Sequence, residues 1–152
     1  MNLTLAIAII AVAAGVIAAA MRRVPIGQVH SLYRRGQPLR LLEPGTHWVV
    51  PGLDRIGHRI DLGGQVLRFE QPQADSHELR GTVYWQVLEP ERAEATIDEA
   101  PQLIRCGALA ALGESPLVAG DRRDLGSRMK QALNGALRER GLMITRVELE
   151  IA

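Results

Sequence analysis

The chain has 152 residues, a length that fits one domain with an appendage better than two domains. Apolar residues make up 47% of the chain and charged residues 23%, and the formal net charge is +1. This balance, without a basic stripe interleaved with aromatic residues, argues against nucleic-acid binding. Cys106 is the only cysteine, which excludes an intrachain disulfide and a thiolate metal cluster.

The N-terminal segment, residues 1–21, carries no charged side chain. A helix over its apolar run, Leu3–Met21, would be about 28 Å long, close to the ~30 Å hydrocarbon core of a bilayer. We therefore predict a transmembrane anchor over residues 1–21 and a soluble domain over residues 22–152. Arg22 and Arg23 follow the run directly, and basic residues beside a span tend to stay in the cytoplasm. We expect a single-pass protein of the inner (cytoplasmic) membrane whose soluble domain is cytoplasmic.

The same segment allows a second interpretation, a cleaved signal peptide. Ala18–Ala20 resembles an A-x-A cleavage site, but Met1–Thr4 lacks the basic residues that precede the apolar part of a signal peptide. A retained anchor is the favoured interpretation. Ala11, Gly15 and Ala19 lie four residues apart, a spacing that permits close helix packing in a membrane, although a plain anchor is the favoured interpretation of this alanine-rich segment.

Several short strands are predicted in the first half of the soluble domain. Val24–Tyr33 is rich in β-type residues and has Pro25 near its start, as an edge strand would. Thr46–Val50 lies between two proline–glycine turn signals. Arg55–Leu62 and Gln65–Glu70 follow in the same style.

The clearest predicted strand is Glu78–Val87, because its apolar and polar residues alternate strictly. This period of two is typical of a sheet with one buried face. The residues expected on the buried face are Leu79, Gly81, Val83, Trp85 and Val87.

The pattern then changes to the helical period. We predict a short helix over Glu89–Ile97, a second over Pro101–Leu112, and a third that has Asp121 as its N-cap and Gly141 after its end. The apolar stripe expected on the third helix comprises Leu125, Met129, Ala132, Leu133, Ala136 and Leu137.

A last strand is predicted over Leu142–Ile151. The residues expected to share one of its faces are Met143, Thr145, Val147, Leu149 and Ile151. Strands, then helices, then a strand predict an α+β domain in which helices cover one face of a mostly antiparallel sheet.

Three motifs resemble the SPFH/band-7 superfamily, which includes the stomatins, prohibitins, flotillins and HflK/HflC. Val24–Val29, directly after a membrane segment, resembles the opening strand of that family. Leu42-x-Pro44-Gly45-x-His47 with Pro51 resembles its L-x-P-G-x-H…P signature, and Glu89–Ala93 stands where the family usually has D-P-x-x-A. The resemblance covers residues 22–152 and implies a short form that lacks the C-terminal coiled coil of most members.

The resemblance implies a non-enzymatic scaffold. Such a protein would self-associate or bind membrane proteins, organising membrane microdomains or regulating a membrane protease. Its partners would be membrane lipid and other subunits in a homo- or hetero-oligomer; no cofactor, small-molecule substrate or nucleic acid is expected. Two alternatives remain: a periplasmic or secreted binding module released by signal cleavage, and a small enzyme with an unrecognised site, which alanine substitutions at His47, Asp54 and Asp61 would test.

Chemical motifs are sparse. The four histidines are scattered without metal-ligand spacing, so neither a metal site nor a catalytic site is predicted. We expect His47 to be packed and hydrogen-bonded, and Cys106 to be a buried, inert thiol.

The candidate functional residues are Trp48, Val49, Val50 and Leu53, an apolar group around Pro51. The corresponding region of relatives lies against the membrane, and tryptophan is favoured at the membrane interface. The alternative is that these four residues fill the core of a sheet.

Overall fold

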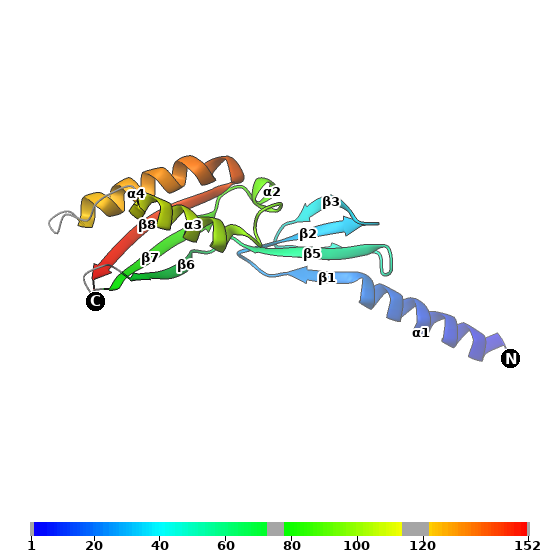
Figure 1. Ribbon diagram of the computed structural model, residues 1–152. Coiled ribbons are helices and arrows are strands. Elements are labelled where there is room, and N and C mark those ends of the chain that lie inside the picture. Colours follow the sequence, from blue (N-terminus) through cyan, green and yellow to red (C-terminus); the bar gives the residue numbers. More distant parts are fainter. Residues whose placement is uncertain (1, 73–77, 114–121, 152) are drawn as a thin grey trace. The chain divides into compact units, whose positions relative to one another are not determined.

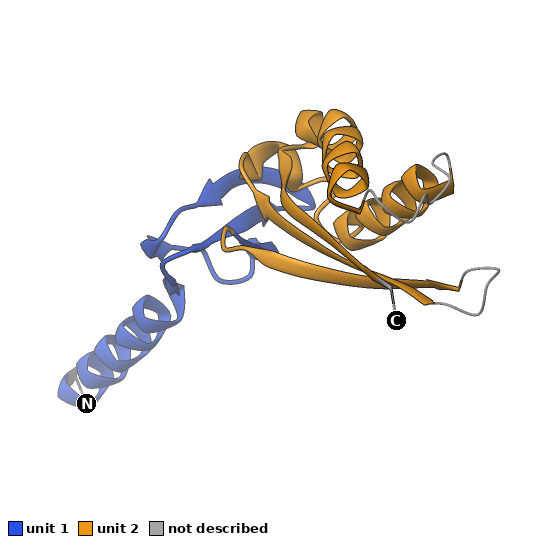
Figure 2. Ribbon diagram, turned by 90° about the vertical axis from the view of Figure 1, so that its left-hand side faces the viewer, with its two compact units in different colours: residues 1–61 blue, residues 62–152 orange. Residues whose placement is uncertain are grey.

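The computed structural model describes residues 2–72, 78–113 and 122–151. The chain divides into two compact units, Met1–Asp61 (unit 1) and Leu62–Ala152 (unit 2), each with its own strands (Figures 1 and 2). The fold class is α+β with antiparallel sheets, as predicted. The prediction of a single sheet is wrong, because the strands form separate sheets in the two units.

Unit 1 contains one long helix and five strands. Strands β1 and β4 form a two-stranded sheet, and a second sheet has the order β3-β2-β5, all antiparallel. The elements are α1 (Asn2–Ala20), β1 (Met21–Val24), β2 (Gln28–Arg34), β3 (Gln37–Leu42), β4 (Gly45–Trp48) and β5 (Asp54–Asp61).

The predicted edge strand Val24–Tyr33 is wrong in two respects. The chain turns after β1, where the Gln28 N–H donates to the Pro25 carbonyl (3.3 Å) and Gly27 takes a φ of 86° that favours glycine. The second part of the segment is β2, which lies in the centre of its sheet. Its neighbour β3 is not among the strands predicted from the sequence.

The core of unit 1 is small and partly polar. Its apolar cluster consists of Val24, Leu32, Leu42 and Val49. Ser31 is also buried, and its Oγ accepts the His58 N–H (2.7 Å) where the register between β2 and β5 shifts. The irregular pairing is thus stabilised by a side-chain hydrogen bond.

Unit 2 is a three-stranded antiparallel sheet of order β6-β7-β8, with α3 and α4 on the same face of the sheet (Figures 1 and 2). The elements are β6 (Gln65–Pro72), β7 (Glu78–Val87), α2 (Pro90–Ala93), α3 (Ala100–Gly113), α4 (Arg122–Leu137), the 3-10 turn η1 (Arg138–Arg140) and β8 (Leu142–Ile151).

Strand β7 confirms its predicted alternation. Its five inward residues, Leu79 to Val87 in steps of two, are buried, and the residues between them are more exposed. Gly81 sits opposite Phe69 of β6, and a Cβ at this position would overlap the Phe69 ring. Because Gly81 has no side chain, the Phe69 ring has room to pack in the core.

The predicted face of β8 is wrong at its start. The register with β7 shifts so that Tyr84 pairs with Arg146 but Trp85 pairs with Ile144, which makes Thr145 an extra residue. Such a bulge reverses which residues face the helices. Leu142 and Ile144 are therefore buried, whereas Thr145 is exposed.

The helices differ from prediction in detail. Helix α2 ends at Ala93 rather than Ile97, whereas α3 and the left-handed Gly141 after η1 match their predicted positions. The proposed N-cap, Asp121, lies outside the described residues. Ala132 and Ala136 are exposed, so they do not belong to the apolar stripe of α4; its buried residues are Leu125, Gly126, Met129, Leu133 and Leu137.

Cys106 on α3 is exposed rather than buried. The helix buries Ala100, Ile104, Ala108 and Leu112, a series in steps of four that leaves Cys106 outside it. The thiol is therefore accessible to solvent in the structure.

Helix α4 is fixed to β8 by two specific contacts. The Asn134 side-chain amide donates to the Ile144 carbonyl (3.0 Å), and its Oδ1 accepts the Ile144 N–H (2.8 Å). At Gly126 the helix comes so close that a Cβ would lie 3.2 Å from the Val147 carbonyl oxygen. Together these contacts hold α4 against β8 at Ile144 and Val147.

Candidate functional site

Helix α1 exposes apolar side chains along its length. Residues Leu3–Ala20 are long and apolar enough to cross a membrane, and almost none of this surface is buried in the described chain. Ala11, Gly15 and Ala19, the candidate packing positions, are all exposed, and no heavy atom of the described residues lies within 4 Å of a Cβ built on Gly15. The helix thus offers a long, nearly continuous apolar surface to its surroundings.

The helix passes into the sheet without an intervening loop (Figure 1). It ends at Ala20, so Met21, which we assigned to the anchor, is the first residue of β1. The Val49 N–H donates to the Ala20 carbonyl (2.8 Å), and Met21 pairs with Trp48 of β4. The end of the apolar helix is therefore bonded to the segment that follows β4.

The four predicted interface residues divide into two groups. Val49 is 7% exposed and belongs to the core cluster, so the core interpretation holds for this residue. Trp48 is 60% exposed, Val50 44% and Leu53 48%. Met21, which was not among the residues predicted from the sequence, is 47% exposed beside Trp48. We name Met21, Trp48, Val50 and Leu53 the junction patch.

A tight turn presents two members of this patch. The Leu53 and Asp54 N–H groups donate to the Val50 carbonyl (3.3 and 3.0 Å), and the Asp54 carboxylate accepts the Val50 N–H (2.9 Å). Arg34 of β2 binds the same carboxylate through Nε and an Nη atom (2.6 and 3.1 Å). The hydrogen bond from Arg34 holds the pKa of Asp54 below its ordinary value, with a further contribution from the Val50 N–H. Asp54 thus remains a carboxylate that positions Val50 and Leu53.

The same geometry bears on the enzyme alternative. Asp54 and Asp61 stand at opposite ends of β5, and seven residue steps of about 3.3 Å separate them by roughly 23 Å. They therefore cannot act as an acid–base pair on one substrate atom. His47 donates from Nε2 to the Glu43 carbonyl (2.7 Å), the structural role expected for it.

Within the described ranges no group of three His, Cys, Asp or Glu side chains could hold a metal ion. His30 is buried in unit 1, with Nε2 at 3.4 Å from the Gln28 Oε1. Burial lowers the pKa of His30, and Arg59 lowers it further. A neutral, buried imidazole fits a structural role in the sheet.

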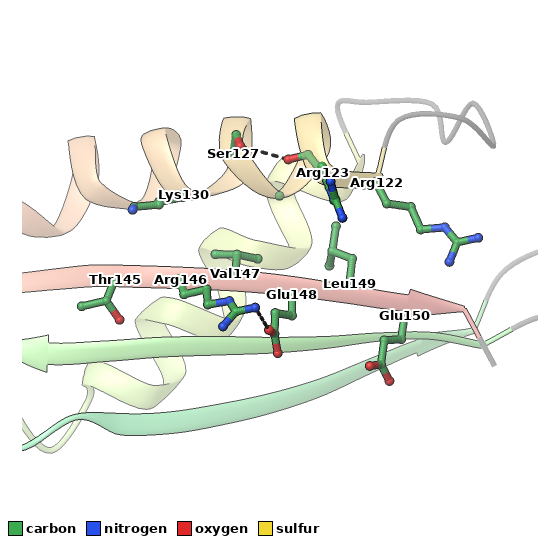
Figure 3. Close-up of a pocket in the computed structure, with 11 residues that line it drawn as sticks. Arg122, Arg123, Ser127, Lys130, Thr145, Arg146, Val147, Glu148, Leu149 and Glu150 are labelled. Atoms are coloured by element: carbon green, nitrogen blue, oxygen red, sulfur yellow. Dashed lines mark hydrogen bonds and ion pairs between the residues drawn. The ribbon is translucent and has the colours of Figure 1, made fainter.

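A second surface is the groove of about 540 Å³ between α4 and β8 in unit 2 (Figure 3). Its α4 wall carries Arg123 and Lys130, while on β8 the Arg146 guanidinium binds the Glu148 carboxylate (2.5 Å). Tyr84 also donates to that carboxylate (3.1 Å). Of the two acids that line the groove, Glu148 and Glu150, the first is thus paired with its neighbours, and the lining has the mixed polarity of a solvated surface.

The comparison with known proteins places the chain in a family. The model of the SPFH domain / Band 7 family matches residues 22–151, almost the whole chain outside the apolar helix. Proteins with this domain are generally membrane-associated scaffolds and are typically not enzymes. The match includes the part of unit 1 that follows Met21, nearly all of unit 2 and the three motifs noted in the sequence. The chain belongs to the SPFH domain / Band 7 family.

Proposed function

We propose that this chain is a single-pass membrane scaffold held in the bilayer by α1. The observation that carries the proposal is the arrangement at the junction: an apolar helix that is exposed along nearly its whole length is followed at once by an exposed apolar patch. Large exposed apolar surfaces on a protein mark contact with a membrane or a partner. A helix of this length matches the hydrocarbon thickness, and Trp48 suits the interfacial layer above it.

The scaffold activity follows from tethering. A chain confined to a membrane meets its neighbours at a high effective concentration, so weak lateral contacts are enough for assembly. We propose that the chain associates with copies of itself or with another membrane protein, such as a membrane protease that it regulates. In the same proposal, assembled copies organise the lipid around them.

The orientation is part of the proposal. Arg22 and Arg23 are exposed on β1, immediately after the span, and would remain in the cytoplasm with the two compact units. The exposed Cys106 makes this testable without any substitution. A thiol reagent that cannot cross membranes should label Cys106 only after the cytoplasmic face is opened; labelling of intact cells or spheroplasts would reverse the assigned side.

The depth of the junction patch tests the membrane contact. Trp48 is exposed and Trp85 is 3% exposed, so lipids with brominated acyl chains should quench Trp48 selectively in proteoliposomes. The matched variant Trp48→Phe should lose the quenching and keep the Trp85 emission. Equal emission from brominated and ordinary vesicles in the wild-type chain would contradict contact between the patch and lipid.

The first residue of the mature protein decides whether a signal peptide has been cleaved. We expect the chain to stay in the membrane after alkaline extraction and to keep Leu3–Met21. A mature protein that begins at Met21 and appears in the soluble fraction would replace the scaffold proposal with a released binding module.

A further inference from the structure

The β2–β3 turn and the beginning of β5 enclose a small hollow in unit 1. Its volume is about 410 Å³, and its lining includes Tyr33, Arg35, Arg55 and Gly57. Tyr33 of β2 pairs with Arg55 of β5, so their side chains lie on the same face of the sheet. A Cβ on Gly57 would overlap the Tyr33 ring. The ring therefore lies directly over this glycine and forms one wall of the hollow.

The hollow is lined by positive charge without a compensating acid. Arg35 and Arg55 both line it, and no acidic residue does, so we name it the arginine pocket. Within the described residues neither of the two arginines forms an ion pair. The nearby carboxylate of Asp54 already accepts hydrogen bonds from Arg34 and from the Val50 N–H. Two guanidinium groups are therefore available to an anion from outside the protein.

The backbone at Arg35 is unusual for an arginine. Arg35 and Gly36 form the two-residue turn between β2 and β3, and their φ angles are 52° and 82°. Such turns favour Asn-Gly or Gly-Gly, because a residue with a bulky side chain is strained at positive φ. The turn itself gains nothing from an arginine at this position, whereas an anion site in the adjoining hollow does.

The arginine pocket lies at the end of unit 1 where α1 enters the sheet (Figure 1). Arg35 is held there because its neighbour Arg34 binds Asp54 (2.6 and 3.1 Å). Leu53 of the junction patch precedes Arg55 by two residues, a reach of at most about 7 Å. The headgroup layer on each side of the hydrocarbon core is about 5–7 Å thick. With Leu53 at the surface of the hydrocarbon, Arg55 lies at the level of the lipid phosphates.

We infer that the arginine pocket binds the phosphate group of an anionic phospholipid. A guanidinium group matches phosphate because its paired N–H donors bind two phosphate oxygens at once. Phosphatidylglycerol offers a phosphate whose charge is not offset, whereas the ammonium group of phosphatidylcholine offsets it within the same headgroup. The inference rests on the proposed membrane anchoring and names the class of lipid that the scaffold gathers.

The test uses the full chain in phosphatidylcholine proteoliposomes that contain increasing fractions of one brominated lipid, either phosphatidylglycerol or phosphatidylcholine. Quenching of Trp48 reports which lipid lies beside the junction patch. The ratio of the two fractions at half-maximal quenching measures the preference, which should favour phosphatidylglycerol. Arg35→Gln and Arg55→Gln should each reduce this preference about fivefold, the usual contribution of one arginine near an anionic membrane surface.

The matched control is Arg22→Gln, which removes the same charge beside the bilayer but outside the arginine pocket. It should lower the preference less than either pocket variant does. Equal losses at all three positions would show diffuse attraction between positive charge and the membrane, and would overturn the inference. All three arginines are exposed, so each variant should keep the urea midpoint of the wild type, which verifies its folding.

A second arm distinguishes a lipid from a soluble ligand. Inorganic phosphate, compared with sodium chloride at equal ionic strength, should leave the preference unchanged. Loss of the preference in inorganic phosphate would assign the arginine pocket to a soluble phosphate and overturn the lipid assignment.

The outcomes also separate this inference from the function on which it rests. Equal quenching of the wild-type chain by the two brominated lipids overturns the lipid preference and leaves the membrane contact of the junction patch intact. No quenching by either lipid overturns the membrane contact as well.

Discussion

The two compact units differ in how many large apolar side chains they leave exposed. Unit 2 has helices α3 and α4 on one face of its sheet, and among its described residues only Val66 and Leu88 stand out as large exposed apolar side chains. Unit 1 has a small core with polar members, His30 and Ser31. Even without α1 it exposes Met21, Ile26, Leu39, Trp48, Val50 and Leu53.

This contrast shows which unit buries most of its large apolar side chains against its own helices and strands. Unit 2 covers one face of its sheet with its own helices. Unit 1 leaves apolar side chains for its surroundings, and those nearest to α1 form the junction patch. The difference lies in how the two units are covered, and it can be probed one residue at a time.

The largest expected effect is the difference in stability loss between two leucine-to-alanine substitutions, one in each unit. Leu133→Ala removes a side chain that is 2% exposed on α4 and should lower the free energy of unfolding by about 2–5 kcal/mol. Leu53→Ala removes a side chain that is 48% exposed and should change it by less than about 0.5 kcal/mol. Urea titrations of the full chain in detergent, followed by tryptophan emission, measure both. Equal losses at the two sites would show that Leu53 is as enclosed as Leu133.

A second test concerns the helix cover of unit 2. Asn134→Ala leaves the Ile144 N–H and carbonyl without their partner, which should cost about 1–3 kcal/mol. Asn134→Asp keeps the acceptor for the Ile144 N–H but loses the donor, and should fall between alanine and the wild type. Hydrogen exchange at the Ile144 amide should accelerate in the alanine variant; unchanged protection would mean that α4 does not depend on this bond.

The polar core of unit 1 predicts a dependence on pH. Because the folded protein lowers the pKa of His30, an unfolded chain binds a proton near pH 6.5 that the folded chain does not bind. The contribution of His30 to stability is therefore complete above about pH 6.5 and declines as the pH falls below it. Urea titrations followed by Trp48 emission between about pH 7.5 and 5 should show this decline, and His30→Gln should reduce it. A slope that is identical in the variant would assign the decline to other groups.

The smallest effect is expected on the exposed surface of unit 2. Arg128 and Asp124 form an i,i+4 ion pair on α4 (3.0 Å), with both side chains more than half exposed. Exposed pairs of this kind contribute about 0.3–0.5 kcal/mol and are screened by salt. Asp124→Asn should therefore shift the urea midpoint slightly at low salt and hardly at all at high salt. A loss comparable to that of Asn134→Ala would contradict the view that this surface is energetically minor.

The sequence predicted the elements whose pattern is local and unbroken. The alternation of β7, the apolar run of α1 and the Pro101 and Gly113 boundaries of α3 each depend on neighbours along the chain, and all three appear in the structure. The exposure of Trp48 and Leu53 could not be predicted, because it depends on whether anything packs over them.

The errors arose where contacts distant in sequence decide the outcome. Strand β3 exists because it pairs with β2, although its own residues carry a weak strand signal. Val49 is buried because Val24, Leu32 and Leu42 surround it, while its neighbours on both sides are exposed. Met21 was missed because it continues the apolar run, although its backbone already pairs in the sheet with Trp48.

The extra residue at Thr145 affects which single-residue deletions in β8 the fold can tolerate. On one side of it the even-numbered residues Leu142 and Ile144 face the helices, and on the other side the odd-numbered Val147 and Leu149 do. Loss of the single codon for Thr145 would leave both sets facing the helices along a straight strand, whereas loss of a codon further along would turn charged side chains inward. Among one-codon deletions in β8, we therefore expect the one at Thr145 to be the best tolerated.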